Sequence, residues 1–435
     1  MMEYQGKKVA LETLGCKLNF SETSAIAHSL EEAGFERVEF GEKADLYVIN
    51  TCSVTNAGDK SSRNAIRRAV RLNQDAFVVV IGCYAQLKPE EIARIEGADL
   101  VLGMEEKFNI PSLLGDLKKK EIPEVRASSL TRLKKYYPSF SRGDRTRSFL
   151  KIQDGCDYFC TYCTIPFARG RSRNQSISQT LDEARKAVSL GFREIVLTGV
   201  NIGDFGKSTG ESFADLLEAL EKVEGLQRLR MGSVEPDLLT DAIISRVASS
   251  RVIMPHFHIP LQSGSDEVLR LMHRRYTTEL FASRVAGIRK AMPLAFIGVD
   301  VIAGTNGESD DLFRESYDFL NRLDISQLHA FPYSERSGTR ALQIPGKVAA
   351  EERKLRTKQY INLSDKKLRA FYAKNMGLTG TVLFEEGSLQ KGISGFTGNY
   401  IRTVLPFRLG MVNQMAEARL TEILPGGDMK GEWDG

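Results

Sequence analysis

The sequence predicts an α/β protein made of an N-terminal parallel-sheet domain, a partial (β/α)6 TIM-like barrel and a small C-terminal all-β barrel. Strands alternate with helices in the first two parts, and that alternation is typical of parallel sheets. Near residue 374 the pattern changes to short strands separated by glycines. The 435 residues are enough for a hydrophobic core in each part. We therefore divide the chain into 1–118, a linker at 119–147, 148–373 and 374–435.

The composition is that of a folded, water-soluble protein, with 42% hydrophobic and 27% charged residues. The longest apolar run, Phe77–Ile81, is far shorter than the roughly 20 residues that a membrane span needs. The opening "MMEYQGKKVALETLGC" has no apolar run of the kind found in signal peptides. We expect a cytoplasmic protein without a membrane partner. Its six cysteines are then reduced, which favours metal binding or catalysis over disulfides.

Three strands and three helices are expected in the first 118 residues. The helices are one capped by Ser21 and ending at Gly34, one near 60–73 and one starting at Pro89. A cysteine follows each strand: Val9–Leu14 and Cys16, Leu46–Asn50 and Cys52, Phe77–Ile81 and Cys83. Because the carboxyl ends of parallel strands share one edge, these cysteines are expected to converge there. The alternative is three separate buried thiols.

Basic residues gather in two places. Residues 126–147 carry seven basic side chains with interleaved aromatics, which suits a phosphate backbone and unstacked bases; a solvated linker is the alternative. Arg63, Arg67 and Arg71 form a stripe on the second helix, where a solvated face is the alternative. The net charge of +4 by itself gives only weak support for a nucleic-acid partner.

Six strands are expected in the barrel: Phe149–Gln153, Ile195–Thr198, Leu229–Gly232, His256–Pro260, Phe296–Ile302 and Gln327–Phe331. Six units are fewer than the usual eight, so the barrel is partial. A long charged helix at 350–373 follows. The segments "LTGTVLFEEG", "GISGFTGNYIRTVLP" and "MAEARLTEIL" predict an OB-like barrel, and the tail "PGGDMKGEWDG" is expected to be disordered.

Cys156, Cys160 and Cys163 lie in the loop after the first barrel strand, with the spacing C-x3-C-x2-C. Barrels of this kind carry their chemistry at the carboxyl ends of the strands. Cuboidal iron–sulfur clusters normally take four protein ligands, so three leave one iron open. An amine and a carboxylate, as in S-adenosylmethionine, can bind that iron, and one electron can then release a primary carbon radical. A zinc or thioredoxin-like site is the alternative.

This spacing resembles the signature of the radical S-adenosylmethionine enzymes, and the order of the three parts resembles the methylthiotransferase family. The resemblance covers nearly the whole chain. It rests on "LGCKLN", "NTCSVTNAGDKSSR", "IGCYAQ", "KIQDGCDYFCTYCTIPFARGRSR", "LTGVN", "VEP", "HIPLQSGSDEVL", "DVIAGTNGE", "FPYSERSGTRA" and "GFTGNYIR". The last of these resembles the RNA-binding TRAM domain.

The resemblance implies two [4Fe-4S] clusters, one held by each set of three cysteines. It implies two roles for S-adenosylmethionine, as methyl donor to a sulfur at the N-terminal cluster and as radical source at the barrel cluster. Reducing electrons would come from a flavodoxin or ferredoxin. Nothing in the sequence predicts an oligomeric state.

Within the family, "LGCKLN" and "TNAGDKSSR" most resemble the branch that acts on N6-threonylcarbamoyladenosine in the tRNA anticodon stem-loop, at carbon 2 of the base next to the anticodon. An exposed loop suits proteins that read unstacked bases. The same chemistry on isopentenyladenosine or on a ribosomal-protein aspartate is the alternative. A non-catalytic RNA-binding metalloprotein is the alternative of a different class, but structural metal sites close with four ligands, and this chain offers two sets of three.

Residues at the other strand ends are candidate contacts for S-adenosylmethionine, with ordinary loop polarity as the alternative. They are Thr198, Gly199, Asn201, Glu235, Gln262 and Ser263. A basic residue is expected to face the carboxylate of the threonylcarbamoyl arm, with Lys17 and Arg169 as candidates. His256 and His258 share one face of a strand, a pattern also found in metal pairs. Because the two cluster sites already account for metal binding, we interpret these histidines as barrel packing, with a metal pair as the alternative.

Overall fold

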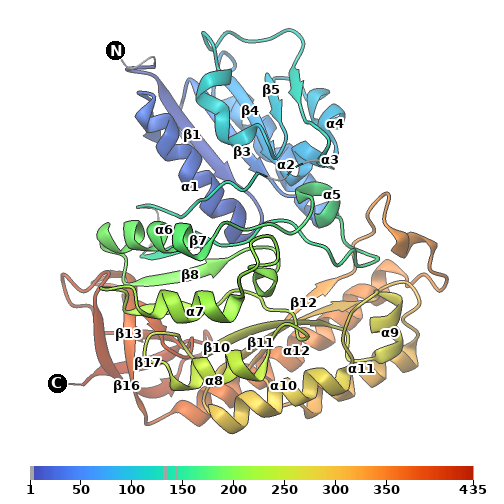
Figure 1. The fold of residues 1–435 in the computed structure, drawn as a ribbon, viewed down its shortest axis with the longest axis vertical. Helices are drawn as coiled ribbons and strands as arrows, with labels where there is room; N and C mark the ends of the chain where they lie inside the picture. Colours follow the sequence, from blue (N-terminus) through green and yellow to red (C-terminus); the bar gives the residue numbers. More distant parts are fainter. Residues whose placement is uncertain (1–3, 131–132, 134, 144–145, 435) are drawn as a thin grey trace.

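The computed structural model describes residues 4–130, 133, 135–143 and 146–434. It has an N-terminal α/β unit, a partial barrel beneath it, and a small β-barrel beside the partial barrel, at the lower left of Figure 1. In the described part of the chain, no helix combines the length and apolar character of a membrane span. The fold class expected from the sequence is confirmed.

The N-terminal sheet has six strands in the order β2-β1-β3-β4-β5-β6, and every neighbouring pair is parallel. The strands are β1 (Lys8–Thr13), β2 (Glu36–Val38), β3 (Leu46–Thr51), β4 (Phe77–Gly82), β5 (Leu100–Leu102) and β6 (Glu124–Arg126). Alternate residues of β4 enter two different hydrophobic clusters, Val78 and Val80 on one face and Val79 and Ile81 on the other. The sheet is therefore buried on both sides.

Helices cover both faces of this sheet. They are α1 (Lys17–Glu32), α2 (Asn56–Leu72), α3 (Cys83–Leu87), α4 (Pro89–Ala93) and the 3-10 helix η1 (Lys107–Leu113). The expectation that Ser21 caps the first helix is wrong, because α1 begins at Lys17 with Cys16 as its N-cap. Ser21 is buried in the second turn, where its hydroxyl lies 2.9 Å from that of Ser139.

Six parallel strands form the partial barrel: β7 (Arg147–Lys151), β8 (Glu194–Thr198), β9 (Arg228–Arg230), β10 (His256–Gln262), β11 (Phe296–Ala303) and β12 (Gln327–Pro332). They make two three-stranded ladders. Isolated parallel bridges, Leu229 with Ile253 and Ser233 with His258, join the ladders between β9 and β10. The six strands expected from the sequence are all present.

The barrel helices are α5 (Ile165–Arg169), α6 (Ile177–Ser189), η3 (Ile202–Asp204), α7 (Phe213–Glu221), α8 (Asp241–Ser249), α9 (Asp266–Leu271), α10 (Thr278–Ala291), α11 (Asp310–Arg322) and η4 (Arg340–Gln343). Several start at a hydroxyl residue whose side chain accepts a hydrogen bond from the first turn: Ser176, Ser212, Thr240, Thr277 and Ser309. The long helix α12 (Ala350–Asn375) packs against β12 and leads into the last unit.

The C-terminal unit is a closed five-stranded barrel in the order β13-β14-β15-β17-β16. Its strands are β13 (Thr379–Ser388), β14 (Gly392–Thr397), β15 (Arg402–Leu405), β16 (Met415–Ile423) and β17 (Met429–Trp433). The expectation of a disordered tail is wrong: β17 pairs with β15 and β16, and Met429 is fully buried. The glycines and charges of the tail suggested disorder. The pairing of β17 with β15 and β16 could not be predicted from the tail itself, because those strands lie earlier in the sequence.

Candidate active site

The structure brings Cys16, Cys52 and Cys83 to one edge of the N-terminal sheet. Strands β1, β3 and β4 are adjacent, with Thr13 opposite Asn50 and Thr51 opposite Gly82, so the three cysteines follow aligned strand ends. A Cβ placed on Gly15 would lie 3.0 Å from the sulfur of Cys52. Cys16 is exposed, Cys52 is half-buried and Cys83 is buried. We call this set the sheet triad.

The sheet triad has the chemistry of a metal-binding set. Burial raises the pKa of the Cys83 thiol to about 11, and the nearby Arg169 guanidinium opposes that rise. A buried thiol of this kind becomes a ligand when a metal supplies the positive charge that stabilises the thiolate. The three thiols therefore fit an iron–sulfur cluster.

Cys156, Cys160 and Cys163 lie in the loop after β7, at the carboxyl edge of the barrel; we call them the barrel triad. Each sulfur accepts one hydrogen bond. Tyr158 N lies 3.4 Å from the sulfur of Cys156, Ile165 N lies 3.4 Å from that of Cys163, and Arg274 Nη1 lies 3.0 Å from that of Cys160. Burial raises the pKa of the Cys156 and Cys163 thiols to about 12. Donors aimed at sulfur are suited to thiolates that bind a cluster.

The two triads are neighbours. The hydroxyl of Thr164, which follows Cys163, lies 3.4 Å from the carbonyl oxygen of Ser53, which follows Cys52. Ala168 of α5 also shares a buried cluster with Cys83. The loop of one triad therefore packs on the edge that carries the other.

The residues expected to contact S-adenosylmethionine all lie at the carboxyl edge of the barrel. Thr198 ends β8, and Gln262 ends β10 with a φ of 73°. Gly199 approaches Gln153 so closely that a Cβ there would lie 2.9 Å from its carbonyl oxygen. Ser263 is buried, and its hydroxyl accepts a hydrogen bond of 3.3 Å from Ser265 N.

Several buried polar atoms at this edge have no partner among the described residues. They are both amide atoms of Asn201, Asp204 Oδ2 and Asp237 Oδ1. Buried polar groups are normally hydrogen-bonded, so such atoms at one edge mark a place for a polar ligand. They fit a molecule that has an amine, a carboxylate and hydroxyl groups.

Glu235 binds Arg274, a residue that sequence reasoning missed. The carboxylate of Glu235 accepts a hydrogen bond from Arg274, which also donates to the sulfur of Cys160. Burial nevertheless raises the pKa of Glu235 to about 7, because desolvation outweighs the cation. Arg274 follows α9 in "HRRY", which carries no motif, and only the folded contact reveals it.

Arg169 is part of an ionic network between the N-terminal unit and the barrel. Its guanidinium lies 3.1 Å from Glu22 and 3.0 Å from Asp154, and Glu22 also accepts from Lys107 at 2.6 Å and Lys151 at 2.9 Å. Glu22 is fully buried, and the cations around it hold its pKa well below the usual range. The expectation that Arg169 faces a substrate carboxylate is therefore wrong, because its guanidinium is buried and committed to protein partners.

Three polar side chains meet inside the barrel. The ligand atoms of His258, Asp300 and His329, on β10, β11 and β12, lie within 4.8 Å of one another. His258 Nε2 lies 2.7 Å from Asp300 Oδ1, and its Nδ1 lies 2.7 Å from Ser233 Oγ. His256 stacks on Phe296 with ring centroids 5.3 Å apart, as the packing interpretation expects. For His258 that interpretation is wrong, because the half-exposed ring belongs to a polar group.

In the described part of the chain, some residues of the basic segments have partners, whereas Arg67 and Arg71 of the stripe on α2 are exposed. Arg126 binds Glu124, and Arg142 lies over the Phe140 ring at 4.5 Å. Arg63 reaches Tyr84 at 2.9 Å and Glu91 at 3.2 Å. Three further basic residues expected to contribute lie outside the described residues: Arg132, Lys134 and Arg145.

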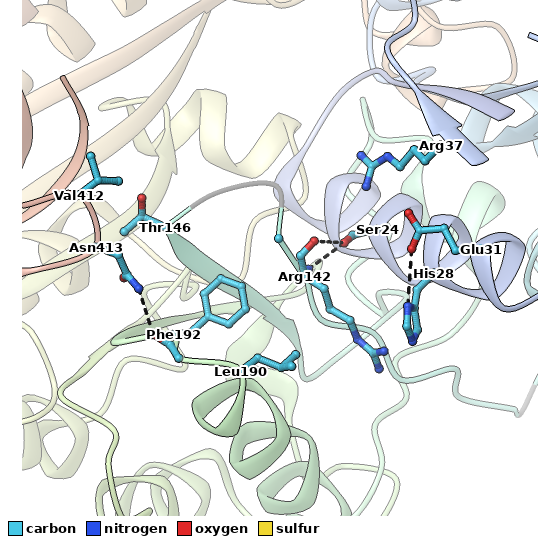
Figure 2. A pocket seen from close by; sticks show the side chains of 12 residues that line it. Ser24, His28, Glu31, Arg37, Arg142, Thr146, Leu190, Phe192, Val412 and Asn413 are labelled. Atoms are coloured by element: carbon cyan, nitrogen blue, oxygen red, sulfur yellow. Dashed lines mark hydrogen bonds and ion pairs between the residues drawn. The ribbon is translucent and has the colours of Figure 1, made fainter. Parts of the chain in front are cut away.

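A cavity of about 790 Å³ lies where the three units meet, away from both triads. Figure 2 shows α1 on one side, with Ser24, His28 and Glu31, and the turn after α6 and a C-terminal barrel loop on the other. Arg142 N donates to Ser24 Oγ at 2.8 Å, and Asn413 donates to Gly191 O at 3.1 Å.

Comparison with known proteins identifies two families along the chain. Residues 8–103 match the family described as "Uncharacterized protein family UPF0004", and residues 150–320 match the "Radical SAM superfamily". Among solved structures, the chain is similar to the radical S-adenosylmethionine methyltransferase TsrM from Kitasatospora setae, with a TM-score of 0.55, 16% identity, and coverage of 75% of this chain and 73% of that one. That likeness supports the fold.

Curated relatives match across most of the chain. The "Threonylcarbamoyladenosine tRNA methylthiotransferase MtaB" of Bacillus subtilis (strain 168) is 39% identical over 95% of this chain and 93% of its own. The protein of the same name from Aquifex aeolicus (strain VF5) is 38% identical over 91% and 95%. A "tRNA-2-methylthio-N(6)-dimethylallyladenosine synthase" of Syntrophus aciditrophicus (strain SB) is 33% identical over 79% and 76%. The chain therefore belongs to the radical S-adenosylmethionine methylthiotransferases, in the threonylcarbamoyladenosine tRNA methylthiotransferase branch.

Proposed function

We propose that this enzyme replaces the hydrogen on carbon 2 of N6-threonylcarbamoyladenosine, next to the tRNA anticodon, with a methylthio group. The observation that carries the proposal is the pair of neighbouring cysteine triads, linked at Thr164 and Ser53. One triad alone would support radical generation, whereas insertion of a methylthio group needs a second place that presents sulfur. The names of the relatives supply the base.

We assign each triad to one [4Fe-4S] cluster, with the sheet triad holding the second. When bound there, the clusters and S-adenosylmethionine supply one-electron chemistry, a methyl group and a carbon-centred radical. The protein's part is to position these groups. Arg274 donates to the sulfur of Cys160, while Thr198, Gly199, Asn201, Glu235, Gln262 and Ser263 form the polar edge for S-adenosylmethionine.

The segments divide the work in this proposal. Residues 1–118 hold the second cluster, 148–373 generate the radical, and 119–147 with the TRAM-like barrel at 374–435 bind RNA. The cavity in Figure 2 contributes Arg37 and Arg142 to the RNA surface between these parts. Because its substrate is tRNA, we place the enzyme in the cytoplasm.

Electrons for the barrel triad come from an external donor such as a flavodoxin or ferredoxin. Helix α5, which follows the loop of the barrel triad, presents an exposed Phe167, and Arg171 lies over the ring of Phe159 in that loop at 4.9 Å. An aromatic surface with an arginine suits a small acidic redox protein, because opposite charges speed encounter.

The substrate is tested with three anticodon stem-loops that carry adenosine, isopentenyladenosine or threonylcarbamoyladenosine at the target position. The reconstituted enzyme is incubated anaerobically with S-adenosylmethionine and a reductant, and nucleosides are separated by mass spectrometry. Conversion of the threonylcarbamoyladenosine RNA well above the other two is expected. Preferred conversion of isopentenyladenosine would assign the other tRNA branch, and conversion of none would contradict the proposal.

A further inference from the structure

Lys17 occupies a position that the proposed function does not yet use. It is the first residue of α1, directly after Cys16, and its side chain is exposed. Among the residues that the structure describes, its ammonium has no hydrogen-bond or ion-pair partner. The neighbouring lysines at the same interface, Lys107 and Lys151, are in contrast both bound to Glu22.

The groups that act electrostatically on Lys17 belong to the barrel and to the C-terminal unit. Arg147 begins β7, Glu194 begins β8 and Arg230 ends β9, while Tyr400 comes from the turn between β14 and β15. Lys17 also acts electrostatically on His256 and His329, on β10 and β12. The ammonium of Lys17, on the N-terminal unit, is therefore electrostatically coupled to residues near the amino-terminal ends of the barrel strands, where α1 packs against β7.

This end of the barrel has a surplus of positive charge. Arg147, Arg228 and Arg230 all lie within 4 Å of Glu194, and Arg147 also pairs with Glu385 at 2.6 Å. The three arginines thus share two carboxylates, and Lys17 adds a further cation. The local surplus is two positive charges, which favours an anionic ligand.

Between the positive end and the carboxyl edge of the strands, the barrel interior is lined by polar side chains that solvent can reach. The side chains of His258 and Asp300 keep 24% and 21% of their surface exposed, although both lie on inward faces of central strands. Ser233, whose hydroxyl lies 2.7 Å from His258 Nδ1, and the neighbouring His329 complete a polar wall between the positive end and the carboxyl edge. A planar base with a polar substituent suits such a wall.

The proposed substrate carries a carboxylate that matches the positive charge at this end of the barrel. Carbon 2 of the purine has to face the triads, at the carboxyl edge of the barrel. The N6 substituent extends from a different side of the ring and ends in the carboxylate of threonine. With carbon 2 held at the carboxyl edge, the rotatable arm can extend toward the opposite end of the strands.

Resting on the proposed function, we propose that Lys17 binds the carboxylate of the threonylcarbamoyl group and so selects this substrate over adenosines with uncharged N6 substituents. A charge-assisted hydrogen bond in a partly enclosed site contributes about 10- to 100-fold to discrimination. The excess positive charge of Arg147 and Arg230 makes this end of the barrel unfavourable for an adenosine with an apolar N6 substituent.

The test compares two enzymes with two RNAs. The wild type and Lys17→Gln are each given a threonylcarbamoyladenosine stem-loop and the same stem-loop with the threonine carboxylate replaced by a carboxamide, and kcat/KM is measured for methylthiolation. The wild type should prefer the carboxylate RNA by about 10- to 100-fold, and Lys17→Gln should lose most of that preference. Lys17→Arg should restore part of it, since the charge returns.

An equal loss on both RNAs would contradict the inference, because Lys17 would then act on the neighbouring Cys16 or on RNA binding in general. Iron content and 5′-deoxyadenosine formation without RNA, measured for each variant, report damage at the sheet triad and the barrel triad. Lys290→Gln, an exposed lysine on α10, is the matched control and should leave the preference unchanged. If the wild type converts neither RNA, the result contradicts the proposed function itself, on which the inference about Lys17 rests.

Discussion

Single side chains decide which basic residues are available to a substrate. Arg169 looks like a loop arginine in the sequence, yet it is 1% exposed and bound to Glu22, Asp154 and Asn19. Lys17, in contrast, is exposed and has no hydrogen-bond or ion-pair partner among the described residues. The cysteines could be predicted because spacing and strand ends are visible in the sequence. Arg274 and Glu22 could not, because their partners are more than 35 residues away and no local pattern records those contacts.

Glu22→Gln should lower the free energy of unfolding by about 3–5 kcal/mol, because it leaves buried cations without their shared carboxylate. Lys107, Lys151 and Arg169 all depend on this group. Denaturant unfolding of the iron-free chain measures the loss. Glu32→Gln removes a largely exposed carboxylate on the same helix, paired with His28 at 3.2 Å, and should cost less than about 0.5 kcal/mol. Similar losses for both variants would contradict the network's role.

Arg274→Ala should lower the reduction potential of the barrel cluster by tens of millivolts, since about 59 mV corresponds to about 1.4 kcal/mol for one electron. The variant removes both a cation and a hydrogen bond to the sulfur of Cys160, and both favour the reduced state. A redox titration followed by electron paramagnetic resonance measures the shift. Arg270→Ala, from the exposed face of α9, is the control. An unchanged potential in Arg274→Ala would show that the contact does not tune the cluster.

At the scale of elements, the strands and their order in the chain could be predicted from the sequence. The first and last residues of the elements could not, because they depend on local backbone geometry. Apolar runs that alternate with helical segments located all six barrel strands. Helix α1 begins earlier than Ser21 suggested, because Cys16, whose side chain makes no capping hydrogen bond, is its N-cap. β17 was missed because its stability comes from pairing with β15 and β16 rather than from its own residues. Two glycines show how turns position the triads: Gly82 at φ 99° before Cys83 and Gly155 at φ 72° before Cys156.

Gly82→Ala and Gly155→Ala should each remove iron from one site only. A Cβ on Gly82 would overlap the carbonyl oxygen of Thr51, and one on Gly155 would overlap that of Arg171, so both turns have to open. Iron per reconstituted chain should fall from about eight to about four in each variant, as expected for two cubane clusters. Gly191→Ala, also at positive φ but with open space around the new Cβ, should keep the full iron content. Full iron in all three variants would contradict this account of the turns.

For the whole molecule, packing of the N-terminal unit on the barrel brings the sheet triad next to the barrel triad. The parts could be predicted separately, but their contact depends on side chains such as Phe20 and Phe149, whose rings lie 5.7 Å apart, and on the network around Glu22. In Figure 1, α1 lies above β7 and β8 with the α5 segment beside α3. The C-terminal barrel is tied in where Arg228 donates to the carbonyl oxygens of Phe396 and Thr381.

The contact between the N-terminal unit and the barrel should become less stable in acid. Surrounding cations depress the pKa of Glu22 and of Asp154 in the folded state, so their contribution is complete above the unfolded carboxyl pKa of about 4 and is lost as the pH falls toward the lower folded values. Protection factors for hydrogen exchange in α1 and β7 of the iron-free chain, corrected for the intrinsic exchange rate at each pH, should therefore fall below pH 4. The Glu22→Gln variant should show a smaller change with pH. Equal pH dependence in the wild type and the variant would contradict this explanation.

The most direct test of the central claim separates the two triads. A variant with Cys156, Cys160 and Cys163 all changed to Ala, and one with Cys16, Cys52 and Cys83 all changed to Ala, are reconstituted anaerobically beside the wild type. 5′-Deoxyadenosine and methylthiolated nucleoside are then measured with the threonylcarbamoyladenosine stem-loop. The account predicts that the barrel variant loses both products, whereas the sheet variant still forms 5′-deoxyadenosine but no methylthiolated nucleoside. Methylthiolation by the sheet variant, or 5′-deoxyadenosine from the barrel variant, would contradict it.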